Sequence, residues 1–257
     1  MGAGLDIFGP QHHFEIILGA IIAFFFMAAG NMMNDYFDRE LDKVNHPERP
    51  IPAGIIKAEQ VYISAGAIFI VLLILGTLIN LLMFIILVTA TFLMVGYELV
   101  FKDRGLVGNF TIGVLTGLLF LFGAAVVSEF GVVIFLFILA ILATLAREIV
   151  KDIEDIEGDI DRITLPKQVG IKNAATAATA VLILAIILSP IPAFPDILPF
   201  FKFGILSMSY IFLIIPADIL FIISMMYFTK KSHLAQNLLK AGMAVALVAF
   251  IVGSIGV

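Results

Sequence analysis

Apolar runs alternate with short polar segments along the whole chain of 257 residues. Each run has roughly the 20 residues that an α-helix needs to cross 30 Å of hydrocarbon. The composition agrees, because 61% of the residues are hydrophobic and only 14% are charged, too few for the surface of a soluble domain. The sequence therefore predicts an all-α, multi-pass transmembrane bundle that forms a single domain over residues 1–257. The expected helices cover residues 14–33, 58–79, 81–101, 107–127, 131–151, 173–189, 203–228 and 236–256.

The basic residues predict how these eight helices are threaded through the cell membrane. Of the 15 Lys and Arg residues, only Lys202 falls outside the side on which the first helix ends. Loops rich in Lys and Arg stay in the cytoplasm, so this side is expected to be cytoplasmic and both termini are expected to face outward. The chain has no Cys, which excludes disulfides, thiolate metal sites and cysteine nucleophiles.

Two of the expected cytoplasmic segments carry the same acidic pattern, Asp-x2-Asp-x3-Asp. If the helices continue through these residues, steps of three and four place each triplet on one helical face. Like charges on one face repel each other, so such a cluster normally needs a compensating cation. The six carboxylates are Asp35, Asp38 and Asp42 in the first motif, and Asp152, Asp155 and Asp159 in the second.

Oxygen ligands without His or Cys favour Mg²⁺ or Ca²⁺ over zinc or copper. Mg²⁺ takes one or two carboxylates and completes its coordination shell with water and substrate phosphate. Basic side chains beside the motifs can bind phosphate oxygens, notably Arg49, Lys151 and Arg162. The pattern therefore predicts a two-sided site for Mg²⁺ and a diphosphate. Two alternatives are solvated helix ends with incidental charge, and a cation transporter, although transporter carboxylates usually lie near the membrane midplane.

Three further polar positions lie near or within the expected spans. Asn34 directly precedes the first motif, and Tyr97 and Lys102 end the third helix on the same side, where they are candidates for contacting substrate phosphate. Asp218 is the one carboxylate clearly inside a span, which makes it either a functional group or a locally paired residue beside Pro216.

The motifs resemble those of the UbiA-type intramembrane prenyltransferases. Asn34-Asp35-x2-Asp38-x3-Asp42 is similar to the first signature of that superfamily, and residues 49–54, RPIPAG, are similar to the segment that follows it. Asp155-x3-Asp159 with the later Thr164-Leu165-Pro166 is similar to the second signature. This resemblance implies that Asp38, Asp42, Asp155 and Asp159 are the catalytic carboxylates. Asp35 and Asp152 are further candidates as ligands or as partners of the ligands.

Within the superfamily, residues 147–155, REIVKDIED, and 45–50, NHPERP, most resemble the archaeal digeranylgeranylglyceryl phosphate synthases. That resemblance implies Mg²⁺-dependent transfer of a geranylgeranyl group from geranylgeranyl diphosphate to the hydroxyl of geranylgeranylglyceryl phosphate. The partners would be a prenyl diphosphate donor, a lipid-like phosphate acceptor and membrane lipids, with no nucleic acid. A second possibility within the superfamily is transfer to an aromatic acceptor such as a quinone precursor.

The sequence departs from the family pattern in two places. Family members have nine helices, so residues 1–13 are expected to correspond to the loop after a first helix that is absent from this chain. The family's Tyr-x3-Lys motif at the third helix contains one extra residue here, because Tyr97 is followed at that spacing by Phe101 and only then by Lys102.

Overall fold

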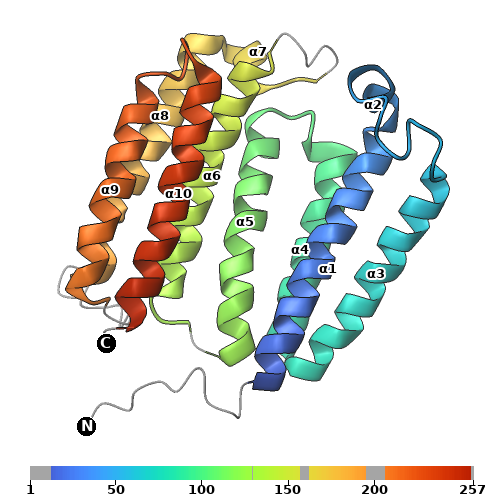
Figure 1. The fold of residues 1–257 in the computed structure, drawn as a ribbon, viewed down its shortest axis with the longest axis horizontal. Helices are drawn as coiled ribbons and strands as arrows, with labels where there is room; N and C mark the ends of the chain where they lie inside the picture. Colours follow the sequence, from blue (N-terminus) through green and yellow to red (C-terminus); the bar gives the residue numbers. More distant parts are fainter. Residues whose placement is uncertain (1–12, 129, 157–161, 195–205, 256–257) are drawn as a thin grey trace. The chain divides into compact units, whose positions relative to one another are not determined.

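The computed structural model describes residues 13–128, 130–156, 162–194 and 206–255. These residues include eight helices that are long and apolar enough to cross a membrane, which confirms the predicted all-α multi-pass fold (Figure 1). The helices, in order, are α1 (His13–Phe37), α2 (Arg39–Asn45), α3 (Ala58–Ile79), α4 (Leu81–Gly96), a π-helix (Tyr97–Phe101), α5 (Leu106–Val127), α6 (Val133–Glu154), α7 (Leu165–Val169), α8 (Ile171–Leu188), a 3₁₀ turn (Ile191–Ala193), α9 (Met208–Met225) and α10 (Ser232–Ile255).

Two spans run further at their C-terminal ends than the hydropathy predicted. Helix α1 continues to Phe37 and α6 continues to Glu154, where the sequence predicted ends at residues 33 and 151. In both cases the extra turn is polar and carries the start of an acidic motif. Hydropathy marks where the apolar run stops, but backbone hydrogen bonding can carry a helix past that point. Residues 203–205, which the prediction placed in the seventh span, lie outside the described residues.

The described chain divides into two compact units. The N-terminal unit contains α1 to α4 and the last turns of α5, at residues 122–128. Helix α3 lies against both α1 and α4 in this unit. Asn80 joins α4 to the end of α5, because its side chain accepts a hydrogen bond from Met83 N and donates one to Ala125 O, both at 2.8 Å. This side chain caps α4 and fixes its start.

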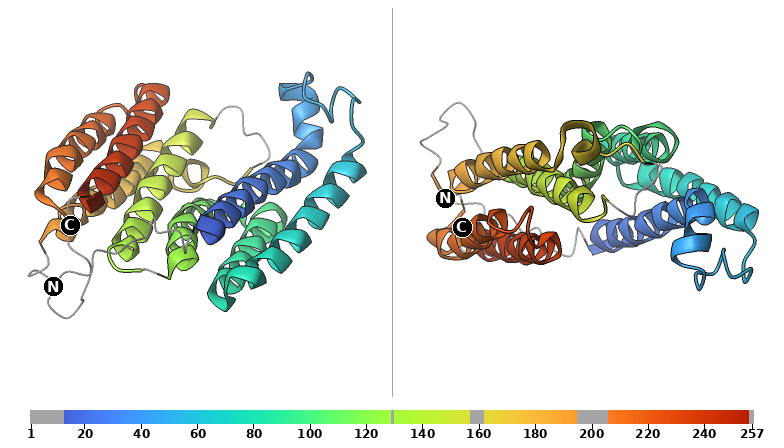
Figure 2. Two further views of the ribbon diagram at one scale, coloured as in Figure 1. Left: turned by 60° about the horizontal axis from the view of Figure 1, so that its bottom comes forward. Right: turned by 90° about the horizontal axis from the view of Figure 1, so that it is seen from above.

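The C-terminal unit contains residues 100–121 of the α5 region together with α6 to α10. Helices α9 and α10 pack side by side along their length, and α6 contacts both α8 and α10 (Figure 2). The interior is built largely from small and branched apolar residues with almost no exposed surface, including Ala146, Ala174, Ala178, Leu182, Ala235 and Leu239. Small side chains let helices approach closely in lipid, where there is no water to drive them together.

Close packing of α5 on α6 depends on two glycines one turn apart. A Cβ atom on Gly113 would lie 3.0 Å from the carbonyl oxygen of Ile141, and one on Gly117 would lie 3.0 Å from that of Phe137. Both carbonyl oxygens are backbone atoms, which cannot move aside as flexible side chains do, and Gly117 would also meet side-chain atoms of Ile141 and Phe137 at 2.9 Å. Gly123, in the same helix, has open space around it and carries no such constraint.

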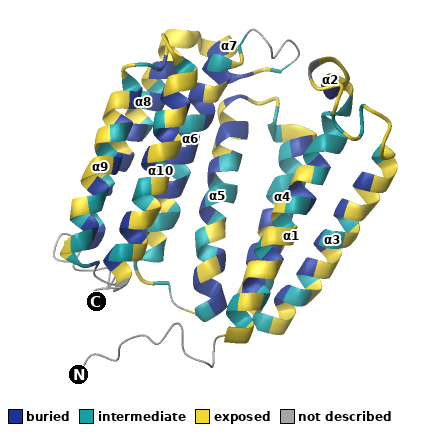
Figure 3. Cartoon of the chain, viewed as in Figure 1, coloured by how far each residue is buried: buried dark blue, intermediate teal, exposed yellow. Residues whose placement is uncertain are grey.

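Large apolar residues are exposed along the spans, and Figure 3 shows the exposed positions in yellow on the long helices. Examples are Phe24 at 68%, Phe92 at 70% and Phe212 at 76% exposure. Soluble proteins rarely leave contiguous apolar surface of this extent in water. These side chains are positioned to contact lipid, as expected for a membrane bundle.

Candidate active site

The first acidic motif lies where α1 gives way to α2. Asp35 belongs to the last turn of α1, Asp38 stands between the two helices with φ −84° and ψ 1°, and Asp42 belongs to α2. Backbone hydrogen bonds from Asp38 N to Asn34 O and from Asp42 N to Asp38 O, both 2.8 Å, carry the helical spacing across the break. The motif is therefore nearly helical without lying on one continuous helix.

Arg49 is the cation that the first motif holds. Its guanidinium donates a hydrogen bond to Asp42 Oδ2 at 2.7 Å and lies 3.7 Å from Asp35 Oδ1. The Asp42 side chain is only 6% exposed, whereas that of Asp35 is 47% exposed. The hydrogen bond to Asp42 raises the pKa of Arg49, so this guanidinium stays charged in any ordinary buffer. Two carboxylates of the motif thus lie close to one positive group. The same carboxylate oxygens are of the kind that bind Mg²⁺.

Asn34 is held by a residue of the π-helix that follows α4. Its Nδ2 atom donates a hydrogen bond to Glu98 Oε1 at 3.0 Å, and the Glu98 residue is buried. The contact joins residues 64 apart in the sequence and ties the start of the first motif to the π-helix. The amide group of Asn34 has two N–H donors and one acceptor oxygen, and this bond uses one of the donors.

The π-helix accounts for the extra residue between Tyr97 and Lys102. A π-turn contains one residue more than an α-turn and commonly arises from a single insertion, often at a functional site. The π-helix runs from Tyr97 to Phe101, and Lys102 follows it directly. A π-turn at this point has room for one extra residue, and Tyr97 and Lys102 stay predicted site residues. Both residues are half-buried.

The second acidic motif begins in the last turns of α6. Asp152 is buried, and its Oδ2 atom accepts a hydrogen bond of 2.8 Å from Asn109 Nδ2 at the start of α5. Lys151 is exposed, and so is Asp155, which follows the last residue of α6. Asp159 lies outside the described residues, so its predicted role is untested.

Two basic residues accompany the second motif. Arg162 is half-buried at the point where the described chain resumes before α7. Arg147 forms an ion pair with its neighbour Glu148, which is buried one turn before Asp152. Of the residues predicted for this segment, Lys151 and Asp152 lie in the last turn of α6 and Asp155 directly follows it.

Among the residues that the structure describes, no three His, Asp or Glu side chains come close enough together to hold a metal ion by themselves. Mg²⁺ does not need three protein ligands in one cluster, because substrate phosphate and water supply the others. The structure thus brings together Asn34, Asp35, Asp42 and Arg49 in the N-terminal unit, and collects Lys151, Asp152 and Asp155 along the end of α6. That both motifs serve one site stays a prediction.

Sequence reasoning missed Glu98 and Asn109. Each is a buried polar residue that hydrogen-bonds a predicted site residue, Asn34 and Asp152 respectively. The available signal was a polar residue inside an expected apolar span, which is costly unless it has a partner. Asn109 follows the Gly108 break and Glu98 follows Tyr97, so both were easily taken as part of the helix ends.

Known proteins with similar sequences support a single family. Residues 2–252 match the UbiA prenyltransferase family. The digeranylgeranylglyceryl phosphate synthase of Methanosphaera stadtmanae is 38% identical over 98% of this chain and 92% of its own length. That of Haloquadratum walsbyi is 40% identical over 92% of this chain and 82% of its own length.

Solved structures agree in fold. One, described as concerning digeranylgeranylglyceryl phosphate synthase in membranes, superimposes with a TM-score of 0.80 at 37% identity, covering 95% of this chain and 87% of the other. A UbiA homologue from Archaeoglobus fulgidus, bound to DMAPP and Mg²⁺, has a TM-score of 0.66 at 17% identity, covering 93% of this chain and 89% of that one. Together with the two acidic motifs, these similarities show that the chain belongs to the UbiA family of intramembrane prenyltransferases.

Proposed function

We propose that this enzyme transfers a geranylgeranyl group from geranylgeranyl diphosphate to geranylgeranylglyceryl phosphate, forming digeranylgeranylglyceryl phosphate for archaeal ether lipids. The observation that carries this proposal is the similarity to synthases of that name, which extends over at least 92% of this chain at 38–40% identity. The motif geometry supports it, because Asp35 and Asp42 converge on a single positive group beside Asn34.

The carboxylates are proposed to hold Mg²⁺, as the UbiA homologue from Archaeoglobus fulgidus is bound to Mg²⁺ together with DMAPP. Bound Mg²⁺ would neutralise the charge that builds on the diphosphate leaving group. The residues assigned to this role are Asp38, Asp42, Asp155 and Asp159, with Asp35 and Asp152 as further ligands or as their hydrogen-bonding partners.

The basic residues are proposed to bind phosphate. Arg49, Lys151 and Arg162 would contact the diphosphate or the phosphate of the acceptor, because guanidinium and ammonium groups make strong charge-assisted hydrogen bonds to phosphate oxygens. Lys102, Tyr97 and Asn34 complete the proposed substrate-binding set. Arg49 already lies against two carboxylates, so its guanidinium can also keep the first motif in place before substrate binds.

In the proposed reaction the allylic C–O bond of the donor breaks and the diphosphate leaves with the electron pair. The hydroxyl oxygen of the acceptor forms the new ether bond to the allylic carbon, and its proton is released. Water would compete for the same carbon, so an apolar, water-poor setting favours transfer over hydrolysis. The eight apolar spans among the described residues would supply such a setting.

Radiolabelled geranylgeranyl diphosphate, offered with Mg²⁺ and a panel of acceptors to the purified protein, tests the proposal. We expect labelled product with geranylgeranylglyceryl phosphate and none with aromatic quinone precursors. If only the aromatic acceptors gave product, the enzyme would instead be assigned prenyl transfer to a quinone-type precursor. Absence of any transfer, combined with cation flux in proteoliposomes, would overturn the enzyme assignment in favour of a transporter.

The acidic motifs are proposed to face the cytoplasm, as the distribution of Lys and Arg indicates. The chain has no Cys, so single introduced cysteines report on sidedness without background. In intact cells, a membrane-impermeant maleimide should label Gly131→Cys, before α6, and leave Lys57→Cys, before α3, unlabelled until the cells are permeabilised. The opposite pattern would reverse the proposed orientation.

A further inference from the structure

Helix α10 contacts the last turn of α6 through two polar side chains. Gln236 Nε2 donates a hydrogen bond of 2.6 Å to Glu154 Oε2, across 82 residues of sequence. His233 Nδ1 lies 3.0 Å from the other carboxyl oxygen, Glu154 Oε1. Both oxygens of the Glu154 carboxyl are therefore contacted by side chains of α10. Glu154 is the last residue of α6, and Asp155 of the second acidic motif follows it directly.

Gln236 makes the stronger of these two contacts. It is only 8% exposed, whereas the His233 side chain is 80% exposed. Exposed pairs contribute little because water and salt screen them, while a buried hydrogen bond to a carboxylate contributes more. Ala235 and Leu239, on either side of Gln236 in α10, have no exposed surface and pack in one apolar cluster with Ile149 of α6. This packing holds the Gln236 amide beside the end of α6.

Glu154 stands at an unfavourable place for a carboxylate. The C-terminal end of a helix carries partial negative charge, which favours Lys or Arg there and disfavours Glu. The hydrogen bond from Gln236 offsets this repulsion, but a pair of apolar residues would join α6 to α10 without creating it. A polar contact inside a helix bundle can instead select one arrangement of the helices where apolar packing tolerates several. The Glu154–Gln236 pair therefore points to a role in fixing the rotation of the last turn of α6.

The same turn of α6 is held from another side by α5, because Asp152 accepts a hydrogen bond of 2.8 Å from Asn109. Positions 152 and 154 are about 200° apart around the helix axis, so the contacts with α5 and α10 lie on nearly opposite faces. Lys151 and Asp155, four positions apart, share the face between them, and both are exposed. A hydrogen bond of 2.9 Å from Asp155 N to Lys151 O keeps their helical spacing.

We propose that Gln236, together with His233, is a positioning residue for the diphosphate site. By holding Glu154, it sets the rotation at which the end of α6 presents Lys151 and Asp155 to phosphate and Mg²⁺. This inference rests on the proposed function, since it assigns a support to the second motif of that site. Mg²⁺ demands near-ideal octahedral geometry, so a small rotation of this turn weakens binding even while the helix stays folded.

Binding of radiolabelled pyrophosphate to the purified full chain, measured over a range of Mg²⁺ concentrations, reports on the site without turnover. Gln236→Leu removes the donor and Glu154→Leu removes the acceptor. We expect each to raise the Mg²⁺ concentration for half-maximal binding about ten-fold, as the loss of a ligand's supporting partner does. The two variants test the same contact, so the comparison stands even if one of them does not fold.

Reversing the pair tests whether the hydrogen bond itself is responsible. The double variant Glu154→Gln, Gln236→Glu again sets one amide against one carboxylate and keeps the net charge of the native pair. We expect it to recover most of the binding that Gln236→Leu loses.

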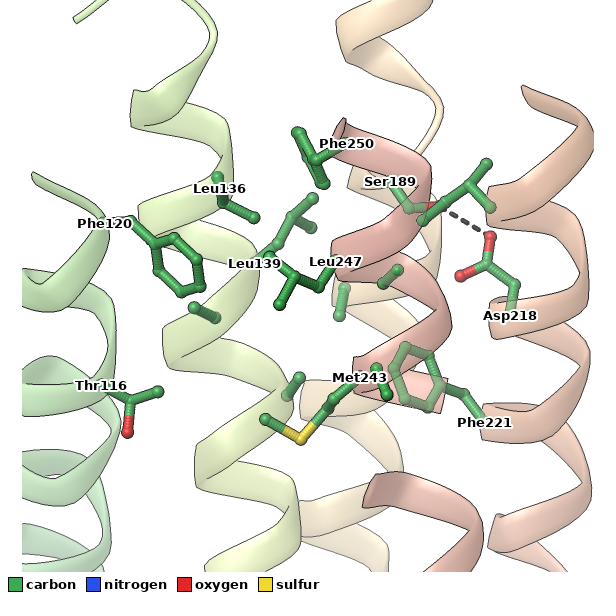
Figure 4. A pocket seen from close by; sticks show the side chains of 16 residues that line it. Thr116, Phe120, Leu136, Leu139, Ser189, Asp218, Phe221, Met243, Leu247 and Phe250 are labelled. Carbon is green, nitrogen blue, oxygen red and sulfur yellow. Dashed lines mark hydrogen bonds between the residues drawn. The ribbon is translucent and has the colours of Figure 1, made fainter. Parts of the chain in front are cut away.

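Ser189→Ala is the control for a loss of stability alone. Ser189 donates a hydrogen bond of 2.7 Å to Asp218 Oδ2, drawn in Figure 4, which gives Asp218 a local partner and joins the end of α8 to α9. Removing this hydroxyl should lower the unfolding temperature and leave the Mg²⁺ requirement for pyrophosphate binding unchanged.

An unchanged Mg²⁺ requirement in Gln236→Leu and Glu154→Leu overturns the inference, and so does an equal rise in Ser189→Ala. Failure of the double variant to bind better than Gln236→Leu also overturns it. Absence of pyrophosphate binding by the native protein at every Mg²⁺ concentration would contradict the proposed diphosphate site, and this inference with it. Binding by the native protein that is weakened in the two Leu variants supports the inference whichever acceptor the enzyme uses.

Discussion

Asn109 donates a hydrogen bond of 2.8 Å to Asp152, and both residues are buried where α5 begins and α6 ends. Ligands of a metal or phosphate site are commonly oriented by such partners, whose loss weakens metal binding by about 10- to 100-fold. We therefore expect Asn109 to orient the Asp152 carboxyl within the second motif.

Replacing Asn109 with Leu keeps the volume of the side chain and removes the donor. We expect a loss of about 1–3 kcal/mol in the free energy of unfolding, because a buried acceptor is left without this bond. We also expect the Mg²⁺ concentration for half-maximal transfer to rise about ten-fold. Denaturation in detergent and Mg²⁺ titration of activity measure the two effects. Asn173→Leu, at an exposed site on α8, is the control. Equal changes in stability and in Mg²⁺ requirement in the two variants would contradict the role expected for Asn109.

Asp38→Ala and Asp155→Ala should each abolish Mg²⁺-dependent transfer while the protein still inserts and folds. Neither residue is buried, so the loss of a carboxylate leaves no cavity in the bundle. Turnover and thermal unfolding are measured on the same purified samples. Glu40→Ala, beside the first motif but fully exposed and paired with Lys43, serves as the control. Turnover near the wild-type value in either Asp variant would rule out its assignment to the metal.

Lys151→Ala should raise KM for a phosphate-bearing substrate, since an exposed ammonium at the end of α6 is available to phosphate oxygens. Initial rates with donor and acceptor varied in turn identify which substrate it contacts. Lys230→Ala is a matched control, an exposed Lys just before α10. If KM for both substrates stays unchanged, Lys151 does not belong to the site.

Gly117→Val should destabilise the C-terminal unit by about 1–3 kcal/mol, the usual cost of overpacking. The added Cβ would lie 3.0 Å from the carbonyl oxygen of Phe137 and 2.9 Å from side-chain atoms of Phe137 and Ile141. Thermal unfolding in detergent measures the loss. The same change at Gly123, which faces open space, should have little effect, and equal losses would contradict this account of α5–α6 packing.

Most of the fold could be predicted from the sequence, but helix ends and polar partners could not. The apolar runs predicted all eight spans, although α1 and α6 continue into the polar motifs. The shift between Tyr97 and Lys102 was visible in the sequence, but its accommodation by a π-helix was not. An insertion can be taken up by a loop, a bulge or a register change, and the neighbouring helices decide which of these is stable.

The sequence by itself determined the membrane setting, the number of spans and the two acidic motifs, because hydropathy and residue spacing are local properties of a chain. Only the tertiary structure decided which polar groups meet. Glu98 binds Asn34 across 64 residues, Asn109 binds Asp152 across 43, and Ser189 binds Asp218 across 29. Each pairing depends on which helices pack together and at what rotation, and a hydrogen bond forms only when donor and acceptor come within about 3 Å.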